Sequence, residues 1–78
     1  MASPSETIYR HLVHYLGPHT TRTALRTFCT KAVGKAPDDV TRAEIPQVLN
    51  ALKPMMRTLI GAKESDAVLT LVTLELGL

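Results

Sequence analysis

Glycine and proline divide this chain into segments, and their positions constrain its fold more than any other feature of the sequence. Gly17 is followed directly by Pro18, and Gly34 and Gly61 each close a stretch in which apolar residues recur at helical spacing. Glycine readily adopts the left-handed conformation in which many helices end, and proline is favoured in the first turn of a following helix. These positions therefore predict four short helices, at about residues 4–16, 18–33, 42–60 and 64–76.

The third segment carries a long apolar register with a proline inside it. Apolar residues recur there at the spacing of one helix face; they are Ile45, Leu49, Leu52, Met56 and Leu59. The register keeps its phase across Pro54, which favours one helix over two. A proline inside a helix removes a backbone hydrogen bond and clashes with the preceding turn, so we expect this helix to be kinked at Pro54.

Capping signals mark where two of the helices should begin. Ser3 stands three residues before Glu6, and Thr41 stands three residues before Glu44. In such pairs the side chains accept hydrogen bonds from free backbone N–H groups at the helix start. The last segment has no such signal, but the alternation of a strand fails at Val72, so we predict a helix there too.

The expected fold is all-α: a single domain, spanning residues 1–78, in which the four helices form a compact bundle. A chain of 78 residues has room for one core, and with two Tyr, one Phe and no Trp that core must be mainly aliphatic. Cys29 is the only cysteine, so no disulfide can form within the chain. The expected core residues are Leu12, Leu16, Leu25, Phe28, Val33, Ile45, Leu49, Leu52, Leu59, Val68 and Val72.

The sequence shows no pattern typical of an active site. A Cys/His nucleophile would have to use Cys29, which lies on the apolar side of its helix, where a free cysteine behaves as a small hydrophobic residue. Asp38 and Asp39 are adjacent in a loop, and the glycines stand at helix ends rather than in a phosphate-binding loop. We therefore expect a protein that is not an enzyme and needs no cofactor.

Three histidines lie close together in the sequence and could in principle bind a metal. His11 and His14 are three residues apart on the polar side of the first segment, and His19 follows the glycine-proline corner. Two imidazoles at this spacing can share a metal ion, with His19 or Cys29 completing the ligand set. Zinc prefers four ligands with supporting hydrogen bonds, and no such motif is present. We expect no metal and keep the three histidines as a minor alternative.

The second segment carries a group of basic residues that could contact nucleic acid. Arg22, Arg26 and Lys31, with several threonines nearby, suit contacts to phosphate groups, and the corner before them is superficially similar to a helix-turn-helix. The net charge is only +2, however, and the acidic residues are scattered along the chain. A concentrated basic patch is the more usual mark of a DNA-binding domain. A small DNA-binding regulator is therefore the alternative function.

The last segment has more apolar residues than a small bundle can cover. Met55 and Met56 add flexible side chains of a kind common on adaptable binding surfaces. An apolar surface that remains uncovered marks a site of protein association. We therefore predict a non-catalytic protein–protein interaction module, a signalling or adaptor domain that forms a homodimer. The expected partner-binding residues are Met55, Met56, Leu69, Leu71, Leu74 and Leu76.

The cysteine usage and the apolar stretches bear on cellular location. A single free cysteine suits a reducing compartment, and the first residues lack the pattern of a signal peptide. The longest apolar stretch, residues 67–78, contains Glu75 and is too short to span a membrane. We therefore expect a cytoplasmic protein with no membrane span.

Tyr15, Leu16, Gly17 and Pro18 form a corner that resembles a known pattern. Small helical modules of bacterial signalling proteins, often appended to serine/threonine kinases or receptor-like proteins, carry a Tyr-Leu/Ile-Gly-Pro corner between two short helices. The resemblance covers residues 14–34, and the second half of the chain does not share it. It implies a bacterial, non-catalytic interaction or signalling module, and it transfers no active-site residues.

Overall fold

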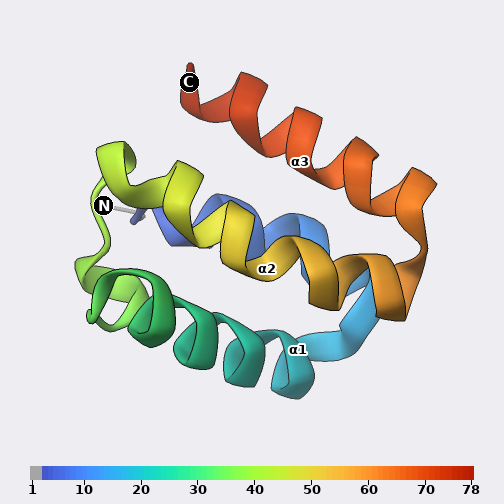
Figure 1. The fold of residues 1–78 in the computed structure, drawn as a ribbon, viewed down its shortest axis with the longest axis horizontal. Coiled ribbons are helices and arrows are strands. Elements are labelled where there is room, and N and C mark those ends of the chain that lie inside the picture. The colour runs from blue at the N-terminus through green and yellow to red at the C-terminus, as the bar shows by residue number, and fades with distance from the viewer. Residues whose placement is uncertain (1–2) are drawn as a thin grey trace.

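The computed structural model describes residues 3–78, and this part of the chain is all-α with no strand. Three α-helices pack into one compact body, with two short 3-10 turns between the first and the second (Figure 1). The α-helices are α1 (Pro4–Val33), α2 (Ile45–Ile60) and α3 (Ala62–Leu76), and the 3-10 turns are η1 (Pro37–Asp39) and η2 (Arg42–Glu44). None of the helices among the described residues is long and apolar enough to cross a membrane.

The prediction of four helices was wrong, because the first two segments form one bent helix, α1. The bend is at Gly17, whose φ of 79° and ψ of 164° are the only non-helical angles within α1. Pro18 pushes the residue before it towards an extended ψ, and glycine alone takes that ψ readily at positive φ. The helical pattern resumes directly after the bend, where Pro18 occupies the first helical position and the hydroxyl of Thr21 donates to the carbonyl of Gly17 at 2.6 Å. We call residues 4–16 the first arm of α1 and residues 18–33 the second arm.

The predicted kink at Pro54 was also wrong. The backbone of α2 remains helical through this proline, and the buried side chains Leu52 and Met56 lie on either side of it. Pro54 itself is exposed, as is Asn50, whose carbonyl loses its intrahelical partner because proline has no N–H. Asn50 is exposed, so its carbonyl can bond to water instead, and the proline costs little. The buried side chains Leu52 and Met56 pack on the opposite face and keep α2 helical across Pro54.

The starts of the helices agree only partly with the capping signals. The carboxylate of Glu44 accepts hydrogen bonds from the Thr41 backbone N–H at 2.9 Å and from the Thr41 hydroxyl at 3.0 Å. These bonds fix the turn η2, so α2 begins three residues later than we predicted, at Ile45. At the start of α1, the Ser3 hydroxyl bonds to the hydroxyl of Ser5 instead of capping the helix.

The core lies where α2 meets both arms of α1 and α3. In Figure 1, α2 runs between the second arm and α3, and the first arm lies behind it. Seven expected core residues are buried, and three others (Leu16, Phe28 and Val33) are half-buried against the core. Leu59 was wrongly assigned, since it is 55% exposed. The buried apolar residues are Ile8, Leu12, Leu25, Cys29, Val40, Ile45, Val48, Leu49, Leu52, Met56, Val68 and Val72.

Candidate interaction surface

Helix α3 presents two faces of similar chemistry, and only one of them is covered. Ser65, Val68 and Val72 point into the core and are at most 2% exposed. On the outer face, Leu71 is 47% exposed and Leu74 is 72% exposed. Leu78, just beyond the helix end, is 45% exposed, and the backbone N–H of Leu78 holds the last turn by donating to the Thr73 carbonyl. We call Ala67, Leu71, Leu74 and Leu78 the leucine face.

The leucine face carries no charge. The exposed residues from 67 to 74 are Ala67, Thr70, Leu71 and Leu74, so an entire solvent-facing stretch of the helix lacks a charged side chain. Solvated helix faces are normally polar or charged. Asp66 and Glu75 lie just before and just after this stretch. An uncharged apolar strip with polar neighbours is the pattern of an association site.

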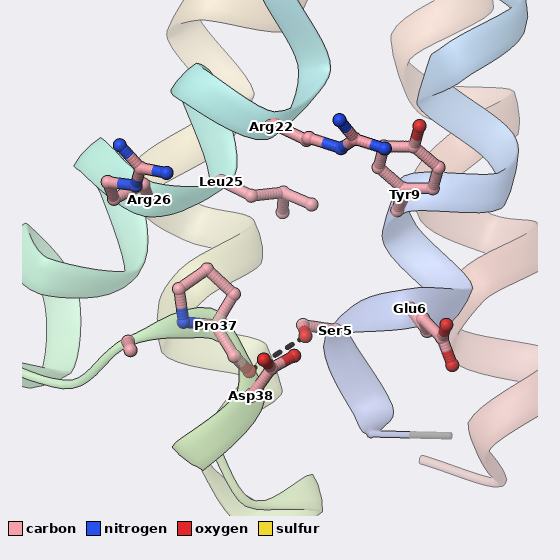
Figure 2. A pocket seen from close by; sticks show the side chains of 9 residues that line it. Ser5, Glu6, Tyr9, Arg22, Leu25, Arg26, Pro37 and Asp38 are labelled. Carbon is pink, nitrogen blue, oxygen red and sulfur yellow. Dashed lines mark hydrogen bonds between the residues drawn. The ribbon is translucent and has the colours of Figure 1, made fainter. Parts of the chain in front are cut away.

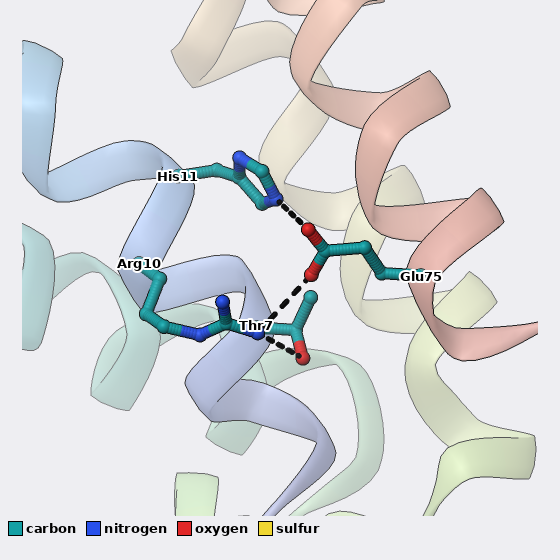
Figure 3. A network of polar contacts seen from close by, with 4 residues as sticks. All are labelled: Thr7, Arg10, His11 and Glu75. Atoms are coloured by element: carbon teal, nitrogen blue, oxygen red, sulfur yellow. Dashed lines mark hydrogen bonds and ion pairs between the residues drawn. The ribbon is translucent and has the colours of Figure 1, made fainter.

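Two glutamates of α3 make polar contacts with the first arm of α1, one near each end of the helix. Near its start, Glu64 accepts a hydrogen bond of 2.9 Å from the Tyr15 hydroxyl. In its last turn, the two carboxylate oxygens of Glu75 contact Arg10 Nη2 and His11 Nε2, each at 3.1 Å (Figure 3). The bond to Glu64 raises the pKa of Tyr15 above its ordinary value, because the accepting carboxylate holds the phenolic proton. The burial of Val68 and Val72 sets the direction in which the leucine face points, and these exposed contacts agree with it.

The structure brings together only part of the predicted partner-binding set. Leu71 and Leu74 are exposed as a partner-binding role requires, whereas Leu69 and Leu76 are half-buried against the core. Met56 is 0% exposed and belongs to the core. The helical register places Leu69 and Leu76 on one side of α3 and Leu71 and Leu74 on the other, and only the packing of the fold shows which of the two sides is exposed.

Met55 and Leu59 form a different surface feature from the leucine face. They line a shallow hollow of about 280 Å³ together with residues of the second arm of α1, including His19 and Ala24. Residues of α3 do not contribute to it. Leu59 and Leu78 could not be recognised from the sequence as surface residues, since Leu59 continues the apolar register of α2 and Leu78 follows the last helical turn.

The histidines and the cysteine are placed separately. His11 contacts Glu75, while His14 and His19 are exposed on opposite sides of the Gly17 bend. Within residues 3–78, no group of three or more His, Cys, Asp or Glu side chains lies close enough to hold a metal ion. Cys29 is 0% exposed, and burial raises the pKa of its thiol.

The basic residues of the second arm are exposed, but acidic residues lie near them. Arg22 and Arg26 line a cleft to which Glu6 and Asp38 also contribute. Lys31 is exposed on the same arm and does not line this cleft. The local charge is therefore mixed, in contrast to the continuous basic surface that favours nucleic acid.

Comparison of the chain with protein-family models, with curated proteins and with solved structures gave no match. The functional argument therefore depends on the fold and on the surface features of this chain. They define a small all-α domain with one uncharged apolar helix face exposed to solvent.

Proposed function

We propose that this chain is a non-catalytic protein–protein interaction module, with a signalling or adaptor role in the cytoplasm, that associates with a second copy of itself through the leucine face. The single observation that carries the proposal is the exposure of Leu71 and Leu74 on one side of α3, with Leu78 also exposed just beyond the helix end. Burying exposed leucine side chains is favourable, at about 25 cal/mol per Å² of apolar surface removed from water.

The spacing within the leucine face supports a second copy as the partner. Leu78 lies beyond the end of α3, after the left-handed Gly77, but Ala67, Leu71 and Leu74 follow one another within the helix at intervals of four and three residues. This is the repeat with which two α-helices pack side by side, each apolar side chain entering a gap on the facing helix. In a two-fold dimer the same face meets itself, and because the leucine face is uncharged, no like charges are brought together.

The size of the leucine face limits how tight the association can be. Helix α3 has 15 residues, and at about 1.5 Å per residue it offers only about two heptads of contact. Stable protein interfaces bury about 1,200–2,000 Å² in total, and a pair of helices this short lies at the low end of that range or below it. We therefore expect a reversible dimer with a Kd on the order of micromolar or weaker.

Sedimentation velocity over a wide range of protein concentrations tests the proposal. The wild-type chain should move from the 8.5 kDa monomer towards twice that mass as concentration rises. Leu74→Glu should weaken association at least tenfold, since it places a charge at the centre of the leucine face. Leu59→Glu is the matched control: it changes an exposed leucine on another surface, so its dimerisation should equal that of the wild type.

Two results would contradict the proposal. One is a wild-type chain that remains monomeric at all concentrations up to the millimolar range. The other is a dimer that persists in Leu74→Glu but is lost in Leu59→Glu, which would move the interface to the hollow between α1 and α2. Circular dichroism of each variant ensures that a change in mass does not reflect unfolding.

The DNA-binding alternative has less support from the geometry. Glu6 and Asp38 lie in the same cleft as Arg22 and Arg26, so a duplex approaching the second arm would meet carboxylates as well as guanidinium groups. Duplex DNA that bound the chain with an affinity falling steeply with salt, and that released it in Arg22→Gln, would favour the alternative.

A further inference from the structure

A cleft of about 440 Å³ lies inside the bend of α1 (Figure 2). One side is formed by the first arm of α1, another by the second arm, and the third by the turn η1 with the residue before it. The Ser5 hydroxyl donates to the Pro37 carbonyl at 2.7 Å, and Ser5 is only 3% exposed. This buried bond joins η1 to the first arm, so the three sides are held together by the fold.

Two arginines form a cationic side of the cleft. Arg22 and Arg26 are four residues apart, so they project from consecutive turns of the second arm. The Arg22 guanidinium lies over the ring of Tyr9, 5.9 Å from its centroid, which restrains its orientation. Within residues 3–78, neither arginine is within ion-pair distance of a carboxylate.

Carboxylates and apolar side chains form the rest of the cleft. Glu6 and Asp38 stand on the first arm and on η1, across from the arginines in Figure 2, and neither makes an ion pair within the described residues. Between the charged groups lie Leu25, which is 4% exposed, and the ring of Pro37. Groups of both signs thus line one cleft without neutralising one another.

We propose that this cleft binds a peptide segment in which an acidic and a basic side chain flank an apolar residue. The acidic side chain would accept hydrogen bonds from the guanidinium groups of Arg22 and Arg26, which suit carboxylates in two-pronged contacts. The basic side chain faces Asp38, and the apolar residue packs on Leu25 and the Pro37 ring. A ligand with only negative groups would be repelled by the carboxylates, and one with only positive groups would be repelled by the arginines. The cleft therefore favours a ligand that carries one charge of each sign.

This inference is independent of the proposed dimerisation. Residues of α3 do not line the cleft, and the leucine face carries none of the charged groups used here. A peptide that bound only the dimer, or that competed with association, would contradict this independence. Leu74→Glu should therefore bind the peptide as the wild type does.

Titration of the isotope-labelled full chain by NMR tests the proposal with defined probes. The probes are the acetylated and amidated tripeptides Lys-Leu-Glu and Glu-Leu-Lys, compared with Gln-Leu-Gln, which keeps the leucine and lacks both charges. At least one charged peptide should give saturable shifts at Tyr9, Leu25 and Asp38, with an affinity at least fivefold above that of Gln-Leu-Gln. Arg22→Gln and Asp38→Asn should each remove most of that difference, whereas Lys31→Gln, an exposed cation outside the cleft, should retain it.

Three outcomes would overturn the proposal. The charged peptides could give no saturable shifts, or Gln-Leu-Gln could bind as well as they do, which would leave only an apolar hollow. Succinate could match the peptides, which would indicate a site for small anions. All three substitutions are at exposed residues, and an unchanged pattern of resonances away from the cleft would establish that each variant is folded.

Discussion

Two buried hydroxyl groups of this domain differ in whether they have a hydrogen-bond partner, and the consequence can be measured for each. Ser65 is 0% exposed, and its hydroxyl has no hydrogen-bond partner within residues 3–78. Thr21 is equally buried, but its hydroxyl donates to Gly17. Since a buried polar group without a partner is destabilising and one with a partner is not, the two hydroxyls should respond oppositely to removal.

We predict that Ser65→Ala increases the free energy of unfolding by about 1 kcal/mol, because it removes the unpaired hydroxyl and adds a residue with higher helix propensity. Thr21→Val, which keeps the shape and loses the bond, should decrease it by about 1 kcal/mol. Urea denaturation of the two variants measures both changes. A loss of stability in Ser65→Ala would mean that its hydroxyl is bonded in solution.

The bond between Tyr15 and Glu64 predicts a pH dependence at the alkaline end. Because the folded state raises the pKa of Tyr15, the stabilising contribution of this bond is fully present below the ordinary tyrosine pKa of about 10. It is lost as the pH rises through the raised value. NMR titration of the tyrosine ring carbons should show Tyr15 ionising at a higher pH in the wild type than in Glu64→Gln. Equal pKa values in the two proteins would exclude the contact.

At the scale of the helices, the effect of a glycine or proline on the backbone depends on how the helix around it packs. Gly17 and Pro18 could be recognised from the sequence as a corner, but not as a bend within one helix. Whether a helix stops or resumes at such a corner depends on the residues after it and on how both arms pack, and here both arms of α1 pack on one core. At Pro54 the sequence predicts a kink that does not occur. The proline lies on the exposed side of α2, where the lost backbone hydrogen bond can be replaced by water, and the sequence alone does not show which side is exposed.

Gly17→Ala should destabilise the fold by about 1–3 kcal/mol, the cost of holding a non-glycine residue in this part of backbone space. The space around Gly17 is open, with no atom within 4 Å of an added Cβ, so the cost would come from the backbone alone. Gly34→Ala is the control, since its φ of 69° and ψ of 24° are left-handed angles that other residues adopt at a smaller cost. Chemical denaturation should rank Gly17→Ala as the less stable; the opposite ranking would show that α1 does not need this bend.

At the scale of the whole molecule, the sequence allowed the all-α class and most of the core to be predicted, because apolar periodicity reports directly on the buried side of a helix. It could not separate Met56 from Met55, or Leu59 from Leu52, because all four lie in or beside one register. Which member of a broad apolar arc is covered depends on where the neighbouring helices begin and end. The cleft inside the bend of α1 could not be predicted from the sequence. It depends on the contact between Ser5 and Pro37, which are far apart in the chain and meet only because α1 bends at Gly17.

The exposed leucines of α3 are the feature on which the proposed function depends. A domain of this size has a small core, and an apolar helix face left in water costs stability that association can recover. The leucine face points outward because the opposite face of α3, with Val68 and Val72, is buried, and the contacts of Glu64 and Glu75 with the first arm of α1 agree with this orientation. The leucine face is therefore positioned by the fold and is available to a second copy without rearrangement.

The most direct test of this account is the sedimentation of Leu74→Glu beside Leu59→Glu and the wild type, at matched concentrations. The account predicts a concentration-dependent dimer for the wild type and for Leu59→Glu, and a monomer for Leu74→Glu with unchanged helical content. If Leu74→Glu associates as strongly as the other two proteins, the leucine face is not the interface and the proposed function is wrong.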